Sequence, residues 1–230
     1  VSANPTGPLH IGHGRGAAMG DSLARLLRFT GHKVECEYYV NDAGRQMATL
    51  GNSVWVRALE LAGRKPEIPE DFYKGDYIIG IARDMLERRP DLLELSPEEG
   101  RKICFEYAHK LMLEWIREDL EEFRVKFDMW SSERAILQSG AVDSVLKRFE
   151  QDGLLFEEEG ALWFKSSSFG DDKDRVLRKS NGDLTYVTTD IAYHEQKYER
   201  GFDLLVDVLG ADHHGYIPRM KAALQALGHD

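Results

Sequence analysis

A turn-rich run at residues 2–14 most limits how this chain can begin to fold, because it leads directly into helical sequence. Pro5 and Pro8 exclude a regular element before His10. Residues 15–29 then have helical periodicity, and apolar side chains share one face at Met19, Leu23, Leu26 and Leu27. The sequence therefore predicts that His10 lies at the N-terminus of a helix.

Two histidines and two glycines cluster at this helix start. Backbone amides in the first turn have no partner inside the helix, and the helix dipole adds partial positive charge, so the position favours an anion such as phosphate. His10 and His13 share a face, while Gly12 and Gly14 allow a base or a phosphate chain close to the backbone. The pattern predicts a nucleotide site; the alternative is that the histidines only cap or pack the helix.

These residues carry a resemblance to a known family. His10-Ile11-Gly12-His13 resembles the signature of class I aminoacyl-tRNA synthetases and related nucleotidyltransferases, and residues 2–9 before it are similar to the arginyl-tRNA synthetase version. The resemblance covers residues 2–228, with several motif regions in the family's order. It implies an enzyme that joins arginine to ATP, accompanied by Mg²⁺, and passes the arginine to tRNA(Arg).

The composition is that of a folded globular protein, since 42% of the 230 residues are hydrophobic and 30% are charged. No apolar run approaches the ~20 residues needed to span a bilayer, and the first residues lack the charged segment and apolar core that are typical of a signal peptide. We therefore expect a cytoplasmic protein without a membrane partner. The formal net charge of −10 has the wrong sign for binding nucleic acid by overall electrostatics, so most tRNA contacts are expected outside this chain.

The order of elements predicts an α/β fold. The opening helix, an alternating strand at 33–40 and a helix at about 45–61 are typical of a Rossmann-like doubly wound parallel sheet. Leu204 to Leu209 form an apolar run that predicts a buried parallel strand. We expect the nucleotide-binding catalytic domain to consist of residues 1–63 and 171–230.

Between these halves, residues 64–170 are expected to form an inserted, mainly helical segment with a small β-hairpin region. Ser96, Pro97 and Glu99 form a capping-box pattern that predicts a helix continuing to about residue 123. Apolar runs at 154–156 and 161–164 predict a hairpin. Asn181-Gly182 predicts a tight turn in a second hairpin, which would join residues 175–179 to residues 184–187.

A second polar loop, Gly210-Ala211-Asp212-His213-His214, follows the predicted strand. It resembles the loop that holds the nucleoside part of ATP in this superfamily, where Gly210 would leave room for the ring and Asp212 would accept from the ribose. Zinc is the alternative, but adjacent side chains rarely converge on one metal and the chain has only two cysteines, so we expect no zinc site. The resemblance implies catalytic roles for His10 and His13 and an ATP site comprising Pro8, His10, Gly12, His13, Gly210, Asp212 and His213.

Tyr186 and Asp190 are four residues apart and suit a guanidinium, which pairs with a planar carboxylate and stacks on an aromatic ring. The residues alone are equally compatible with a core tyrosine and a helix-capping aspartate. Residues 184–194, however, are similar to the arginyl-tRNA synthetase motif that contacts the arginine side chain. The arginine site implied by the resemblance comprises Ser2, Asn4, Tyr186, Asp190 and His214.

Other expectations concern the chain as a whole. The charge-rich run at 169–177 resembles the family, but its composition is typical of a surface loop and we assign it no chemistry. The family's second signature and its anticodon-binding domain would lie beyond residue 230, so this chain alone is expected to charge tRNA poorly. The alternatives are another class I synthetase or adenylyltransferase, or a noncatalytic synthetase-derived binding module.

Overall fold

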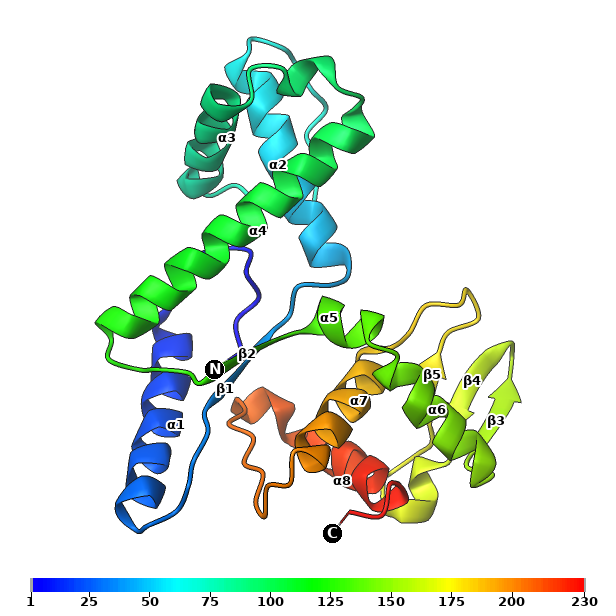
Figure 1. The fold of residues 1–230 in the computed structure, drawn as a ribbon. Helices are drawn as coiled ribbons and strands as arrows, with labels where there is room; N and C mark the ends of the chain where they lie inside the picture. The colour runs from blue at the N-terminus through cyan, green and yellow to red at the C-terminus, as the bar shows by residue number, and fades with distance from the viewer. Residues whose placement is uncertain (1, 230) are drawn as a thin grey trace. The chain divides into compact units, whose positions relative to one another are not determined.

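A computed structural model describes residues 2–229, except for the side chains of Ala211 and Asp212 (Figure 1). The chain divides into two compact units, Val1–Trp130 and Ser131–Asp230. These units are defined by how closely their residues pack. The functional division into catalytic halves (1–63 and 171–230) and an insertion (64–170) stays a prediction. None of the helices in the described part has the length and apolar character needed to cross a membrane.

In the first unit, α1 (Ile11–Phe29) starts directly after His10, as predicted. Its core-facing side chains are small, at Ala17 and Ala24, whereas Met19 and Leu26 on the predicted apolar face are 65% and 59% exposed. The core beside α1 surrounds Tyr38 and Val40 on β1 (Glu37–Val40), which is hydrogen-bonded to β2 (Met129–Ser132).

The first unit also contains α2 (Arg45–Leu61), which lies within the first predicted catalytic half. The helices α3 (Asp76–Arg88), η1 (Leu92–Glu94, a short 3-10 helix) and α4 (Pro97–Glu122) lie within the predicted helical segment. Figure 1 shows α2 and α3 beside the first half of the long α4. The capping box that starts α4 is confirmed: the Glu99 amide donates to Ser96 Oγ, and the Ser96 amide donates to the Glu99 carboxylate. The three long helices enclose a common core, which includes Leu50, Val54, Ile78, Ile81, Cys104 and Met112.

The second unit consists of short helices around a small sheet. Its elements are α5 (Glu133–Gln138), α6 (Ala141–Gln151), β3 (Leu155–Glu158), β4 (Ala161–Phe164), η2 (Ser166–Phe169), β5 (Arg175–Arg178), α7 (Tyr186–Glu199), η3 (Ala211–Tyr216) and α8 (Ile217–Ala226). Strands β3, β4 and β5 pair in that order, and both pairs are antiparallel.

The two hairpin predictions have different outcomes. The first is confirmed, because β3 pairs with β4 and Leu155 lies opposite Phe164. The second holds at its first strand, which is β5, and at its turn, where Gly182 has a φ of 88° that glycine adopts readily. A single bridge joins Arg178 to Leu184, and the chain is already helical from Tyr186. The start of α7 replaces the second half of the predicted strand 184–187.

The predicted buried strand from Leu204 to Leu209 is wrong for this structure. These residues form no strand, and Leu204 and Leu209 are 67% and 51% exposed. A strand requires neighbouring backbone with which to form hydrogen bonds, and no part of the described chain pairs with this run. The run is instead attached to α7 through the side chain of Asp207.

Candidate functional site

The irregular opening stretch of the first unit is held in place by a buried tyrosine. The backbone amide of Ala3 donates to Tyr38 Oη at 2.8 Å, and this hydroxyl donates to the Ala3 carbonyl at 3.1 Å. Tyr38 is completely buried, and its ring stacks on Trp130 with 4.4 Å between the ring centroids. Burial raises the pKa of Tyr38 to about 12, so its hydroxyl stays protonated and acts as both donor and acceptor.

The predicted site residues Ser2 and Asn4 lie on this anchored stretch. Ser2 Oγ donates to the Tyr39 carbonyl at 2.6 Å, and the Asn4 side-chain amide donates to Gln46 Oε1 at the start of α2. A further anchor comes from α3, where the Tyr77 hydroxyl donates to the carbonyl of Thr6 at 2.7 Å. Side chains from β1, α2 and α3 therefore hold residues 2–6.

The sequence assigned no role to the three anchoring side chains, although it indicated that the run containing Tyr38 lies near the site. Tyr38 belongs to the run Tyr38-Tyr39-Val40-Asn41-Asp42, which matches the family, so the resemblance contained a signal for it. Gln46 and Tyr77 belong to ordinary helical sequence, and nothing local distinguishes them. Their contacts become visible only when distant segments are brought together.

His10 and His13 form a stacked pair at the N-terminus of α1, with ring centroids 3.7 Å apart. The Gly12 amide donates to His10 Nδ1 at 3.1 Å, and the His10 amide donates to His13 Nδ1 at 3.2 Å. Because each Nδ1 accepts a hydrogen bond, each neutral ring carries its proton on Nε2. Burial, followed by the neighbouring His10, lowers the pKa of His13 and favours this neutral form.

The glycine between the histidines leaves room for this capping geometry. A Cβ at Gly12 would lie 3.0 Å from His10 Cε1 and 3.1 Å from His10 Nδ1, so any side chain there would press on the ring. A Cβ at Gly14 would have nothing within 4 Å. Pro8, two residues before His10, is also exposed. The backbone at the helix start is therefore open, and two imidazole N–H donors lie beside it.

In the second unit, Tyr186 and Asp190 both lie in the first turns of α7. Tyr186 is 63% exposed, which excludes a core role, and the N-cap of α7 is Thr185, which excludes Asp190 as the capping residue. The Asp190 carboxylate accepts a hydrogen bond from the hydroxyl of Tyr216, at the end of η3. Burial raises the pKa of Asp190, and the Tyr216 hydrogen bond opposes that rise.

A polar network joins α7 to the 204–209 run, with His194 and Lys197 buried and Asp207 exposed. His194 Nδ1 lies 2.7 Å from the Asp190 carbonyl, and His194 Nε2 lies 2.7 Å from Asp207 Oδ2. Lys197 Nζ donates to Asp207 Oδ1 at 2.8 Å. Burial opposes ionisation of Asp207, but the hydrogen bonds and positive charges of His194 and Lys197 together lower its pKa. His194 and Lys197 are therefore both engaged by Asp207.

The predicted ATP loop folds as the N-terminal part of η3. Gly210 is the residue before η3, and its carbonyl accepts from the His213 amide at 3.0 Å. His213 and His214 are exposed, whereas the side chain of Asp212 lies outside the described residues. Within the described part of the chain, no three His, Cys, Asp or Glu side chains are grouped closely enough to bind a metal ion.

The charge-rich run has a structural role, which corrects the expectation of a solvated surface loop. Arg175 forms two hydrogen bonds of 2.7 Å to the buried carboxylate of Asp171, one through Nε and one through Nη2. Ser166 Oγ also donates to Asp171, at 3.1 Å, so the cluster ties η2 to the start of β5. Bidentate Arg–carboxylate pairing of this kind fixes geometry as well as charge.

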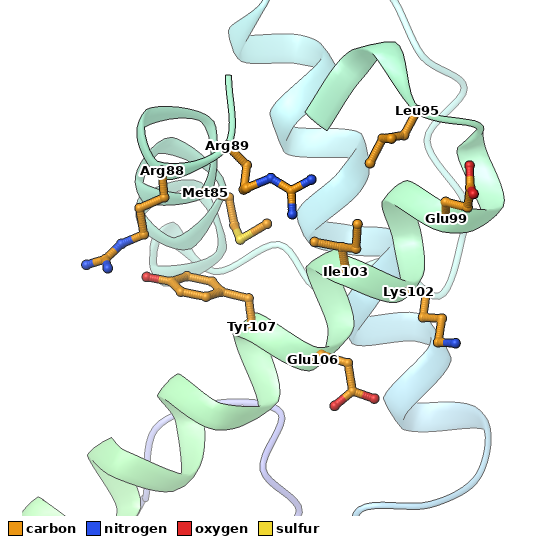
Figure 2. Close-up of a pocket in the computed structure, with 9 residues that line it drawn as sticks. All are labelled: Met85, Arg88, Arg89, Leu95, Glu99, Lys102, Ile103, Glu106 and Tyr107. Carbon is orange, nitrogen blue, oxygen red and sulfur yellow. The ribbon is translucent and has the colours of Figure 1, made fainter. Parts of the chain in front are cut away.

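A separate hollow of about 560 Å³ lies between α3 and α4 (Figure 2). None of the site residues predicted from the sequence lines it. Arg88 and Arg89 on its rim already pair with Asp84 and Asp91, so their charges are balanced locally. We assign no function to this hollow.

Comparisons with known proteins agree with the resemblance. A family model described as "tRNA synthetases class I (R), catalytic domain" matches residues 1–230. The chain is 63% identical over 228 residues to an arginine–tRNA ligase of Nitratidesulfovibrio vulgaris, covering 99% of this chain and 41% of the relative. It is 58% identical over 230 residues to the arginine–tRNA ligase of Lawsonia intracellularis, covering 100% of this chain and 42% of the relative.

The structural comparison confirms the predicted α/β fold class. The crystal structure of a Campylobacter jejuni arginyl-tRNA synthetase matches with a TM-score of 0.92 and 43% sequence identity, covering 100% of this chain and 51% of that protein. The chain thus has a class I synthetase fold. It spans about two fifths of the length of the curated relatives it matches.

Proposed function

Because this chain belongs to the family of class I arginyl-tRNA synthetase catalytic domains, we propose that its protein activates arginine with ATP and transfers it to tRNA(Arg). In the first step, a carboxylate oxygen of arginine forms a bond to the α-phosphorus of ATP, and the bond from that phosphorus to pyrophosphate breaks. In the second step, a hydroxyl of the terminal adenosine of the tRNA attacks the arginyl carbonyl, and AMP leaves.

The observation that carries this proposal is the stacked pair of histidines at the start of α1. Both Nδ1 atoms are occupied by backbone amides, so both Nε2–H groups are available to phosphate oxygens near the helix N-terminus. The α-phosphate gains negative charge as it becomes five-coordinate, and fixed donors aimed at that charge lower the barrier. We assign catalysis to His10 and His13, and ATP binding to Pro8, His10, Gly12, His13, Gly210, Asp212 and His213.

For arginine, Asp190 supplies a half-buried carboxylate, and the ring of Tyr186 is exposed at the start of the same helix. A guanidinium pairs with the first and stacks on the second. We assign the α-amino and carboxylate end of arginine to Ser2 and Asn4, which are held on the anchored opening stretch, and place His214 near the amino acid.

The remaining parts of the proposal follow from the family. Mg²⁺ enters with ATP and is bound mainly by phosphate oxygens and water, which is compatible with the absence of a three-ligand cluster among the described residues. Residues 1–63 and 171–230 form the catalytic halves, with 64–170 inserted between them. The protein works in the cytoplasm, and most tRNA contacts lie outside this chain.

Arginine-dependent exchange of pyrophosphate into ATP, measured on the full-length protein with tRNA present, tests the proposal. His10→Asn keeps a favourable helix-capping residue but removes the Nε2–H donor, so we expect kcat to fall by about 10²-fold while helix content is unchanged. His32→Asn, at an exposed position beyond the end of α1, is the matched control. Unchanged exchange in His10→Asn would contradict the assigned role, and no exchange by the unmodified protein would favour a noncatalytic binding module.

A further inference from the structure

We propose that Tyr216 is a positioning residue for arginine recognition: its hydroxyl holds one oxygen of Asp190 and leaves the other for the guanidinium. This inference rests on the proposed function, because it takes arginine to be the ligand of Asp190. Tyr216 lies at the end of η3 (Ala211–Tyr216), two residues beyond His214, and outside the residues that the family resemblance assigns to the arginine site.

The first observation is the direct contact between two elements distant in sequence. The Tyr216 hydroxyl donates to Asp190 Oδ2, which joins η3 to α7 across 26 residues of sequence. Burial raises the pKa of Tyr216, and the adjacent Asp190 charge raises it further, so the hydroxyl keeps its proton and donates it to the ionised carboxylate. A neutral hydroxyl in this position orients the carboxylate without supplying a negative charge for the guanidinium.

The second observation is that Asp190 has no cationic partner among the described residues. Of the positive groups that influence it, His194 and Lys197 on α7 are both bonded to Asp207. Arg219 on α8 lies over the ring of Tyr216, with its guanidinium carbon 5.2 Å from the ring centroid. In the part of the chain that the structure describes, no lysine or arginine forms an ion pair with Asp190. A half-buried carboxylate without a cation is a favourable partner for the guanidinium of a ligand.

The arrangement also opposes the rise in the pKa of Asp190 that burial causes. The Tyr216 hydrogen bond stabilises the charged form, and the nearby charges of His194 and Lys197 act in the same direction, whereas Asp207 acts against it. Removal of the Tyr216 hydroxyl would therefore raise the pKa of Asp190 further. Arginine binding requires the ionised carboxylate. As the pH falls, binding would therefore be lost at a higher pH in the variant than in the unmodified protein.

The test compares Tyr216→Phe with the unmodified full-length protein in arginine-dependent pyrophosphate exchange. Loss of a hydrogen bond to a charged group corresponds to about a 10-fold weaker interaction, so we expect KM for arginine to rise about 10-fold with kcat and KM for ATP nearly unchanged. We also expect the acidic limb of the kcat/KM profile for arginine to move to higher pH. A purely structural role of Tyr216 would neither raise KM for arginine alone nor move the acidic limb of the kcat/KM profile.

Two further variants separate the possible results. Tyr198→Phe is the control, because Tyr198 stacks on His229 through its ring, 3.9 Å between centroids, and lies outside the assigned machinery. Asp190→Asn reports on the proposed function itself, through loss of the preference for arginine over citrulline. If that preference depends on Asp190 but Tyr216→Phe behaves like the unmodified protein or binds arginine more tightly, the positioning role is overturned. If the unmodified protein shows no such preference, the proposed function and this inference both fail.

Discussion

The ion pair between Arg175 and Asp171 shows how strongly one residue can depend on another inside a fold. The Asp171 side chain is 1% exposed and the Arg175 side chain is 11% exposed, so neither charge is well solvated. Removing one member of such a pair leaves the other buried without compensation, which costs far more than the loss of a surface ion pair. The run that reads as a solvated loop therefore contributes to the stability of the second unit.

We expect Arg175→Met to lower the free energy of unfolding by about 3–5 kcal/mol at neutral pH. Arg175 lowers the pKa of Asp171, so the contribution of the pair is present above the unfolded-state pKa of about 3.9 and is lost as pH falls toward the lowered folded-state value. Urea unfolding at neutral and acidic pH measures this. Arg178→Met, at an exposed position of the same strand, should have little effect. Equal stability of the two variants at neutral pH would contradict the structural role.

At the scale of elements, the close approach of α2 and α4 depends on glycines within both helices. A Cβ at Gly51 would lie 2.7 Å from the Arg101 carbonyl oxygen and 2.7 Å from Phe105 Cβ. A Cβ at Gly100 would lie 2.1 Å from the ring of Trp55. Glycine costs helix stability, so its presence here is explained by tight packing and not by local preference.

Gly51→Ala should therefore destabilise the chain by about 1–3 kcal/mol, because the backbone of α4 cannot move aside as a flexible side chain can. Gly80→Ala provides the matched control in α3, where a Cβ would meet nothing within 4 Å. This second change should stabilise the helix by up to about 1 kcal/mol. Urea unfolding followed by circular dichroism distinguishes the two. If both alanines stabilise the chain, α2 and α4 do not pack as closely as described.

At the scale of the whole molecule, the charge balance bears on tRNA binding. The 40 acidic residues exceed the 30 basic residues, which gives the formal net charge of −10. The electrostatic attraction to phosphates that supplies most nonspecific nucleic-acid affinity is therefore weak for the chain taken as a whole. This agrees with the proposal that most tRNA contacts are made outside these residues.

We expect the 230-residue chain alone to bind tRNA(Arg) with a Kd weaker than about 10⁻⁶ M at physiological salt. Fluorescence anisotropy over a series of salt concentrations would measure the affinity and its salt dependence. The full-length protein serves as the positive comparison and should bind more tightly. Submicromolar binding by the chain alone, with a steep salt dependence, would show that a local basic surface outweighs the net charge.

The sequence by itself determined the features that have local signals. The start of α1 after His10, the capping box at Ser96 and the hairpin of β3 and β4 each follow from residues within a few positions of one another. The family was also recognisable from short motifs in order. Hydrogen-bond capping, helical periodicity and turn chemistry act over one or two turns of chain, so a linear sequence displays them directly.

Only the tertiary structure decided which distant residues meet. The contacts of Tyr38 with Ala3 and of Tyr216 with Asp190 span 35 and 26 residues. The same limit explains the error at Leu204 to Leu209: an apolar run indicates that a strand is possible, but pairing requires a neighbouring strand that the run itself cannot specify. Burial, hydrogen-bond partners and shifted pKa values are properties of the surroundings, and the surroundings exist only once the chain has folded.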